Sequence, residues 1–319
     1  MSKRYLELTP TQLTQLSKQD FLDGIRASEG RVVGAYVCPL APNYIEKVSN
    51  AELVAAFGAD YITLEGYDPR EVQFPGLPSK NPEDDIDTRS KLQVELGKGY
   101  TIPEIKKLTG RPVGMILLVP RENEVFGGIY KESIYSKEMM EYLIQEQYDF
   151  ICLCGYGQEP LIQAVSEASA LFKDQIVIEA GIPHGPGAID GDFPPHNLRE
   201  VVTPEFVRRL AHAGADIVDI PAVDIVPGFN MEYVSQLVTE IHEEHSLAAS
   251  SVAHSLEASS KEVLERIILD NKVCGVDMFN IAAGGVFESV TLPETLKDIC
   301  IAVKGKRHTY RRMAQSPLR

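Results

Sequence analysis

Two acidic residues stand where short apolar runs end, and their type and placement make them the first candidates for chemistry. Glu179 follows residues 176–178, and Asp219 follows Ile217 and Val218. If the two runs are neighbouring strands, side-chain alternation can place both carboxylates on one face. Two carboxylates that close either bind a divalent cation (Mg²⁺ or Zn²⁺) or share one proton with separated pKa values. The ordinary alternative is that each caps a helix or pairs with an arginine.

Other acid–base candidates also follow apolar runs. Glu65 ends the run at 61–64, His184 lies in the loop after Glu179, and His254 follows a run of small residues. Because imidazole titrates near neutral pH, His254 is a candidate for proton transfer. A histidine bonded to a backbone carbonyl is an equally good interpretation.

A possible anion site follows the last apolar run. Gly284 and Gly285 form a pair there, and paired glycines let backbone N–H groups approach an oxyanion closely. We expect these glycines to bind phosphate, with further contacts from the polar residues Ser255, Arg121, Asn280 and His184. A Gly-Gly turn that serves only sterics is the alternative.

The elements that would position these residues alternate along the chain. Continuous apolar runs predict strands of a parallel sheet covered by helices. The predicted strands are 32–37, 61–64, 113–119, 150–154, 176–178, 217–220, 247–252 and 278–282. The predicted helices are 50–57, 102–108, 137–147, 160–173, 204–213, 231–245, 261–270 and 293–304.

Eight such units predict an α/β fold, a (β/α)8 TIM barrel at residues 31–319, preceded by an N-terminal helical extension at 1–30. A doubly wound sheet is the rival. The strand-to-helix loops are the long ones, and in a barrel they gather at the C-terminal face, where active sites lie. The loop from Glu65 to Thr101 is long enough to act as a lid over that face.

A related phrase occurs twice, four units apart. Gly58-Ala59-Asp60 enters the second predicted strand, and Gly214-Ala215-Asp216 enters the sixth. In both, a glycine ends a helix just before a strand begins. We interpret both aspartates as structural, because they lie at the end of the strand opposite to the candidate site.

Composition narrows the class of partner. The net charge of −15 and the pI near 5.0 argue against a nucleic-acid or anionic-membrane surface. No long apolar run is present, so we expect a cytoplasmic protein that acts on a small molecule, and a homo-oligomer by default. Five scattered cysteines fit a reducing compartment, and Cys152 and Cys154 are interpreted as small core residues, not zinc ligands.

Missing motifs narrow the chemistry further. The sequence contains no lysine at the ends of predicted strands four to eight, which disfavours a Schiff-base aldolase. It also contains no GxGxxG after a strand, no GxxxxGK[ST] and no GxSxG, so no nucleotide cofactor motif is present.

The opening LELTPTQLTQLSKQDFLDGIRASEGR and the segment SNAELVAAFGAD resemble a bacterial barrel family over essentially the full length. Its members carry the labels phosphoenolpyruvate phosphonomutase-like or haloacid dehalogenase-like hydrolase. The sequence departs from both chemistries: the first strand ends Tyr36-Val37-Cys38-Pro39 without the dehalogenase aspartate, and Cys152-Leu-Cys154-Gly155-Tyr156 replaces the lyase-group Lys-Lys-Cys-Gly-His. Locally, Ala283-Gly284-Gly285-Val286 resembles the phosphate-binding barrels of histidine and tryptophan biosynthesis.

These observations favour a metal-assisted lyase or isomerase that acts on a small phosphorylated metabolite. In it, Glu179 and Asp219 hold the cation or act as base, and His254 moves a proton. One alternative is a metal-dependent hydrolase that uses the same carboxylates with His184 and His254. The other is a ligand-binding or regulatory barrel without catalysis, because this fold hosts many functions.

Overall fold

Eight parallel strands close into a barrel in which each strand pairs with the next along the chain and the last pairs with the first. The structure is a computed structural model that describes residues 3–86, 94–125, 131–182, 198–253, 256–282 and 290–319. The (β/α)8 prediction is confirmed. The strands are β1 (Val32–Val37), β2 (Tyr61–Leu64), β3 (Val113–Leu118), β4 (Phe150–Cys154), β5 (Val177–Gly181), β6 (Ile217–Pro221), β7 (Leu247–Val252) and β8 (Met278–Ile281).

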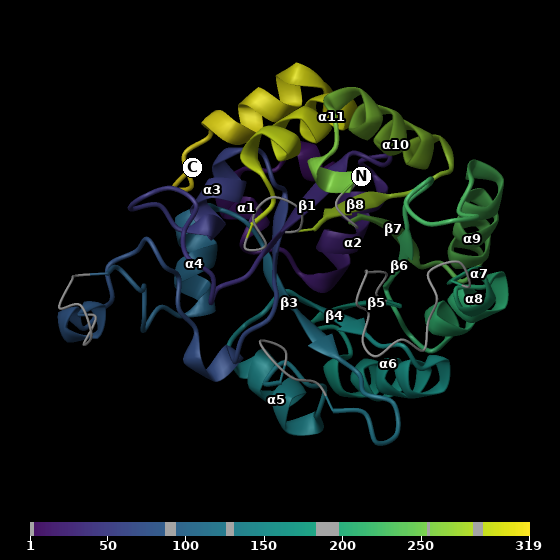
Figure 1. Cartoon of the computed structure of the whole chain (residues 1–319), viewed down its shortest axis with the longest axis horizontal. Coiled ribbons are helices and arrows are strands. Elements are labelled where there is room, and N and C mark those ends of the chain that lie inside the picture. The colour runs from purple at the N-terminus through teal and green to yellow at the C-terminus, as the bar shows by residue number, and fades with distance from the viewer. Residues whose placement is uncertain (1–2, 87–93, 126–130, 183–197, 254–255, 283–289) are drawn as a thin grey trace.

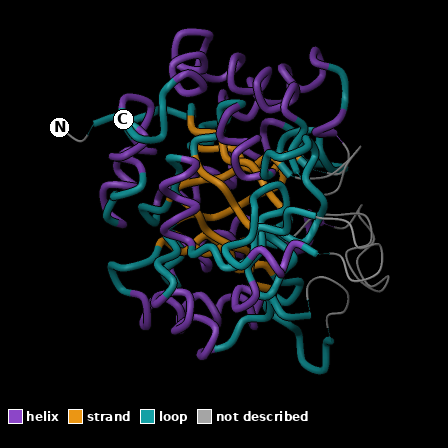
Figure 2. The backbone as a smooth tube through the Cα atoms, turned by 90° about the vertical axis from the view of Figure 1, so that its left-hand side faces the viewer, coloured by secondary structure: helices purple, strands orange, loops and turns teal. Residues whose placement is uncertain are grey.

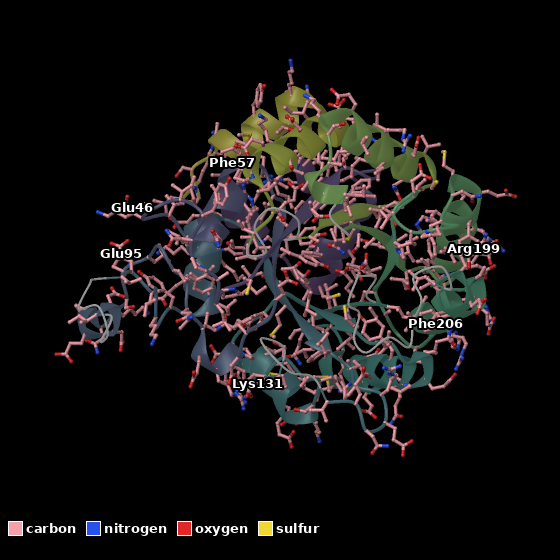
Figure 3. The ribbon with its side chains drawn as sticks, viewed as in Figure 1. Glu46, Phe57, Glu95, Lys131, Arg199 and Phe206 are labelled. Carbon is pink, nitrogen blue, oxygen red and sulfur yellow. The ribbon has the colours of Figure 1, made fainter. Side chains whose placement is uncertain are left out.

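Helices form the outer layer around these strands (Figures 1 and 2). Their apolar faces pack against the outward-facing residues of the barrel, as Phe206 does at 2% exposure, whereas charged side chains such as Glu46 and Lys131 lie at the periphery (Figure 3). The helices of this layer are α3 (Asn50–Ala56), α4 (Ile102–Thr109), α5 (Lys137–Gln145), α6 (Gln158–Phe172), α7 (Leu198–Val201), α8 (Pro204–His212), α9 (Met231–Glu243), α10 (Lys261–Val273) and α11 (Pro293–Ala314).

The N-terminal extension closes the bottom of the barrel. It consists of η1 (Tyr5–Glu7), α1 (Pro10–Leu13) and α2 (Lys18–Arg26). Thr9 and Ser17 cap the two helices as their sequence positions predict. The apolar residues of this extension and of the inner barrel floor form one buried cluster: Tyr5, Leu8, Leu13, Phe21, Leu22, Ile25, Val32, Tyr61, Phe150, Val177, Ile217, Leu247, Ala249 and Met278.

An aspartate precedes every even-numbered strand and binds the strand before it. The side chain and the backbone N–H of each aspartate bond the two backbone polar groups of one residue on the preceding odd strand. The pairs are Asp60 with Val33, Asp149 with Val113, Asp216 with Ile178, and Asp277 with Ala248. Asp60 and Asp216 are therefore structural, as predicted. The aspartate of the repeat that the sequence showed at two places occurs before all four even-numbered strands.

Each of these aspartates also faces a basic side chain. The most buried is Asp60, which is fully buried between Lys304 at 2.5 Å and Arg312 at 3.0 Å, both from α11. These two cations lower the pKa of Asp60 against the effect of its burial. Arg312 also donates to the carbonyl oxygens of Tyr5 and Leu8, so α11 ties the N-terminal extension to the barrel floor.

The described part of the long loop after β2 lies at the side of the barrel (Figure 1). It contains the short turns η2 (Pro69–Glu71) and η3 (Pro82–Asp85) and lies next to α4 (Figure 1, left). Lys80 of this loop pairs with Glu104 of α4 at 2.6 Å. The lid stays a prediction from the length of the loop.

Candidate functional site

Three polar side chains from three strands meet inside the barrel. Glu179 lies on β5, Asp219 on β6 and Asn280 on β8. Glu179 and Asn280 are each only 1% exposed, whereas Asp219 is partly exposed. All three had been predicted as site residues, and the structure brings them together.

The side-chain amide of Asn280 bridges the two carboxylates. Its Nδ2 lies 2.5 Å from Glu179 Oε1 and 3.3 Å from Asp219 Oδ1. At the other end of the amide, the Tyr61 hydroxyl donates to Asn280 Oδ1 at 2.5 Å, which fixes the amide with its N–H groups toward the acids. The Tyr61 ring lies over Gly34 of β1, the strand between β2 and β8, and any side chain at Gly34 would collide with it.

Asp219 has a second hydrogen bond of its own. The Ser251 hydroxyl on β7 donates to Asp219 Oδ2 at 2.6 Å. Burial raises the pKa of Asp219 to about 6, although the bonds from Ser251 and Asn280 oppose that rise.

Glu179 holds its proton more tightly than Asp219. Burial, and then the nearby charge of Asp219, raise the pKa of Glu179 to about 8, and the bond from Asn280 only partly offsets this. Near neutral pH the pair therefore carries one proton, held by Glu179, and one negative charge, on Asp219. One acid and one base in contact are the arrangement used for proton transfer.

Strand β5 runs further than its apolar run indicated. The run ends at Ile178 and Glu179 was expected at the end of the strand, facing the interior, but β5 continues to Gly181. In the register, Glu179 pairs with Ile217 and Asp219 pairs with Gly181. The two acids are thus offset along their strands, and Asn280 spans the offset.

Two other predicted residues have their described contacts outside this trio. Glu65 directly follows β2, where its backbone N–H donates to Val37 and its charge raises the pKa of the Cys38 thiol, although burial is the larger cause. Arg121 follows β3 and pairs with Glu124 at 3.1 Å. Because Glu124 partly neutralises Arg121, less of its positive charge is available to bind a substrate anion.

Five predicted residues lie outside the described part of the chain: His184, His254, Ser255, Gly284 and Gly285. Their proposed roles in proton transfer and phosphate binding stay predictions from sequence. The described ends of their loops, at Ile182, Ala253 and Ala282, follow β5, β7 and β8 and so lie at the C-terminal end of the barrel.

Sequence reasoning missed Tyr61, Ser251 and Tyr36, whose side chain packs inside the barrel on the cluster that contains Cys152 and Cys154. All three lie within predicted strands, where an aromatic or a small polar residue is usually taken for core. The signal available in the sequence was the alternation of side chains along a strand. Tyr61 and Tyr36 are an even number of residues from other inward-facing positions of β2 and β1, so they also face inward.

Cys152 and Cys154 of β4 line the same interior. Their sulfur atoms lie 3.5 Å apart, and both side chains pack with Ile116 and Leu118. Their mutual hydrogen bond and burial raise the pKa of the Cys152 thiol well above its usual value. Both features agree with the interpretation of these thiols as core residues.

The donor set fits a shared proton better than a cation. A divalent cation between the carboxylates needs oxygen ligands, but Asn280 directs N–H groups into that space. Within the described residues there is no group of three or more histidine, cysteine, aspartate or glutamate side chains that could hold a metal ion.

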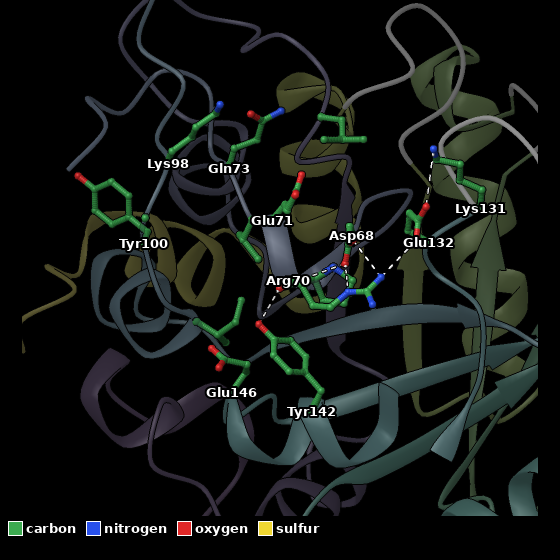
Figure 4. A pocket seen from close by; sticks show the side chains of 15 residues that line it. Asp68, Arg70, Glu71, Gln73, Lys98, Tyr100, Lys131, Glu132, Tyr142 and Glu146 are labelled. Atoms are coloured by element: carbon green, nitrogen blue, oxygen red, sulfur yellow. Dashed lines mark hydrogen bonds and ion pairs between the residues drawn. The ribbon is translucent and has the colours of Figure 1, made fainter. Parts of the chain in front are cut away.

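A separate pocket of about 740 Å³ lies on the outside of the barrel, between the loop after β2 and helix α5 (Figure 4). Its central cation, Arg70, pairs with Asp68 at 2.7 Å and with Glu132 at 3.2 Å. Arg70 is thus neutralised within the pocket, whereas the interior trio brings two buried acids together through one amide, so the interior trio is the better site. No described helix has the length and apolarity to cross a membrane.

Comparison with known proteins adds a family and a set of distant folds. The model of a family described as "Domain of unknown function (DUF7916)" matches residues 6–319. No curated protein matches the chain.

Solved structures with a similar fold include the carboxyl transferase domain of Rhizobium etli pyruvate carboxylase with 3-bromopyruvate. It has 14% identity and a TM-score of 0.48, over 98% of this chain and 52% of that one. A putative fructose-1,6-biphosphate aldolase from Coccidioides immitis has 12% identity and a TM-score of 0.46, over 99% and 100% of the two chains. The chain thus spans about half the length of the carboxyl transferase chain that it matches.

Proposed function

The chain belongs to the DUF7916 family, and from the geometry of its barrel we propose an enzyme of small-molecule metabolism that transfers protons through Glu179 and Asp219. A lyase or an isomerase is the class of reaction that such a pair of acids serves best. The observation that supports the proposal is the buried pair of carboxylates bridged by one amide, Asn280.

The two acids have different tasks. Asp219 is the partly exposed member and is charged near neutral pH, so it is the base that touches the substrate. Glu179 is 1% exposed and protonated, so it acts through Asp219 as the group that holds the second proton. Their separation in pKa keeps one acid and one base available at the same pH.

The other candidate is the divalent cation predicted from sequence, with Glu179 and Asp219 as its ligands. Mg²⁺ would take their oxygens with waters and would displace the shared proton. The N–H groups of Asn280 favour the proton over the cation. A titration with metal salts separates the two, as described in the Discussion.

The substrate predicted from sequence is a small phosphorylated metabolite. The glycines that would bind its phosphate follow β8, and Asn280 lies on that same strand. The phosphorylated class therefore rests on the sequence of the segment after β8. The alternative reaction predicted from sequence, hydrolysis with His184 and His254, would use the same carboxylates.

The test is proton exchange with solvent. The purified protein is incubated in D₂O with a panel of small phosphorylated metabolites, and loss of carbon-bound proton signals is followed by ¹H NMR. We expect exchange with at least one compound, and a loss of about a hundredfold or more in Asp219→Asn, as for removal of a general base. The matched control is Glu205→Gln, which changes a carboxylate whose side chain is 62% exposed.

Exchange that survives unchanged in Asp219→Asn contradicts the proposal. Binding of a panel compound without exchange of any proton would instead support the barrel without catalysis.

A further inference from the structure

Two hydroxyl groups lie on the side of the barrel that faces the acids. Tyr36 of β1 and Thr63 of β2 are direct partners in the register. By the closed strand order, β1 lies opposite β5 and β2 lies opposite β6, the strands of Glu179 and Asp219. Thr63 is two residues after the inward-facing Tyr61, so its side chain also points into the barrel.

Tyr36 lies against the interior at the level of the acids. Its ring packs with the cluster of Ile116, Leu118, Cys152 and Cys154. After burial and the Cys152 thiol, the charges of Asp219 and Glu179 raise the pKa of the Tyr36 phenol. The phenol therefore stays protonated and remains a hydrogen-bond donor beside the carboxylate pair.

Both hydroxyls lack an acceptor among the described residues. Thr63 is 1% exposed, and its Oγ1 has no hydrogen-bond partner there. The described contacts likewise include no hydrogen bond to the Tyr36 hydroxyl, and Tyr36 is only half-buried, so a ligand can reach it. A buried hydroxyl without a partner costs stability, which makes it a marker of a place where a bound molecule supplies the partner.

We propose that Tyr36 and Thr63 bind the carbonyl oxygen of the substrate, so that the substrate class is a small carbonyl compound with a hydrogen on the adjacent carbon. This inference rests on the proposed function, because it needs a base on the other side of the substrate. Donors aimed at an oxygen that gains charge in the transition state contribute more to catalysis than to substrate binding.

The step balances without an external oxidant or reductant. Asp219 takes the proton from the carbon next to the carbonyl, and the electron pair of the broken C–H bond forms a carbon–carbon double bond. The π pair of the carbonyl moves onto its oxygen, which keeps its hydrogen bonds to Tyr36 and Thr63. Return of the proton from Asp219 to another carbon re-forms the carbonyl and gives an isomerase. Alternatively, the electron pair re-forms the carbonyl and expels a hydroxyl group from the next carbon, which leaves as water with the proton held by Asp219, and this gives a lyase.

Binding of acetohydroxamate tests the inference without turnover. This small neutral compound has a carbonyl oxygen for the two hydroxyls and N–H and O–H donors for Asp219. Its affinity is measured by NMR titration of the whole protein. We expect binding to the unaltered chain and a loss of about tenfold in Tyr36→Phe, the usual effect of one hydrogen bond.

Controls separate this role from a structural one. Tyr310→Phe, which changes a tyrosine that is 51% exposed, should bind acetohydroxamate as the unaltered protein does. Thr63→Val removes the unpartnered Oγ1 at constant volume, so it should weaken binding and leave the melting temperature unchanged or higher. A lower melting temperature in Thr63→Val would show that Oγ1 has an internal partner and would overturn its part in the site.

The two proposals fail separately. Equal affinity in Tyr36→Phe, or no binding to the unaltered chain, overturns this inference alone. Proton exchange that persists in Asp219→Asn overturns the proposed function, whatever the result with acetohydroxamate.

Discussion

Asn280 donates its side-chain amide to Glu179 at 2.5 Å across the barrel interior, although the two residues are 101 positions apart in the sequence. The same amide reaches Asp219, so one neutral side chain determines how two buried acids share a charge. Each of the predictions below perturbs this arrangement or the floor that supports it.

Glu179→Gln should stabilise the fold at high pH. Because the folded-state pKa of Glu179 is raised from 4.5 to about 8, its ionisation costs stability progressively between those values. The neutral variant avoids that loss, so its advantage should grow from pH 5 to pH 8.5 and amount to a few kcal/mol at most, since one pKa unit is about 1.4 kcal/mol. Urea unfolding at both pH values measures it.

The control for this measurement is Glu205→Gln, whose carboxylate is exposed. Because this variant keeps Glu179, its free energy of unfolding should change with pH as that of the unaltered chain does. A Glu179→Gln variant with the same pH dependence as the unaltered chain would contradict the raised pKa.

Asn280→Ala should raise the pKa of both acids. The amide donates to each carboxylate and thereby favours the charged forms, so its removal leaves burial and mutual repulsion unopposed. ¹³C NMR of side-chain carboxyl groups, titrated from pH 4 to 9 without any substrate, reports both values. If neither titration moves, the amide does not tune the pair.

Treatment with a metal chelator should not change the stability of the protein. If the pair holds a proton, dialysis against EDTA should not change the melting temperature, and calorimetric titration with MgCl₂ or ZnCl₂ should show no proton release at pH 7. A cation bound at a hundred times its Kd would add about 2.7 kcal/mol, which is easily measured. A fall in melting temperature that Mg²⁺ restores would assign the pair to the cation.

Asp60→Asn should destabilise the fold strongly. It leaves Lys304 and Arg312 buried without their carboxylate, and breaking a buried ion pair costs about 3–5 kcal/mol. The control is Asp23→Asn, which breaks an exposed pair with Arg26 and should cost about 1 kcal/mol or less. Because the pKa of Asp60 is lowered, its contribution is present above pH 3.8 and is lost as the pH falls further.

Much of the fold could be predicted from sequence because every strand is covered by helices. Such strands are continuous apolar runs, and the bounds of β1, β2, β4 and β7 were predicted as the structure has them. The error at β5 has the same origin: Glu179 interrupts the apolar run, so the pattern ended the strand before its last three residues.

The site could be predicted only in part. Glu179 and Asp219 stand out because carboxylates are rare among inward-facing strand residues, and parity placed both inside. The bridge by Asn280 depends on the offset between strands around a closed barrel, which no local pattern encodes. Tyr36 was hidden for another reason: in a strand, a tyrosine that serves the core and one that serves a substrate look alike.

The four aspartates at the barrel floor have a consequence for how the barrel comes apart. Each joins an odd strand to the even strand after it, so β1 with β2, β3 with β4, β5 with β6, and β7 with β8 are clamped at one end. The seams between these pairs have no such aspartate clamp among the described contacts, although the Ser251 hydroxyl bonds Asp219 across the seam between β6 and β7. Local unfolding should therefore release the strands in pairs. Amide hydrogen exchange would report it as four blocks of common protection, and the acids of β5 and β6 would open together as one block.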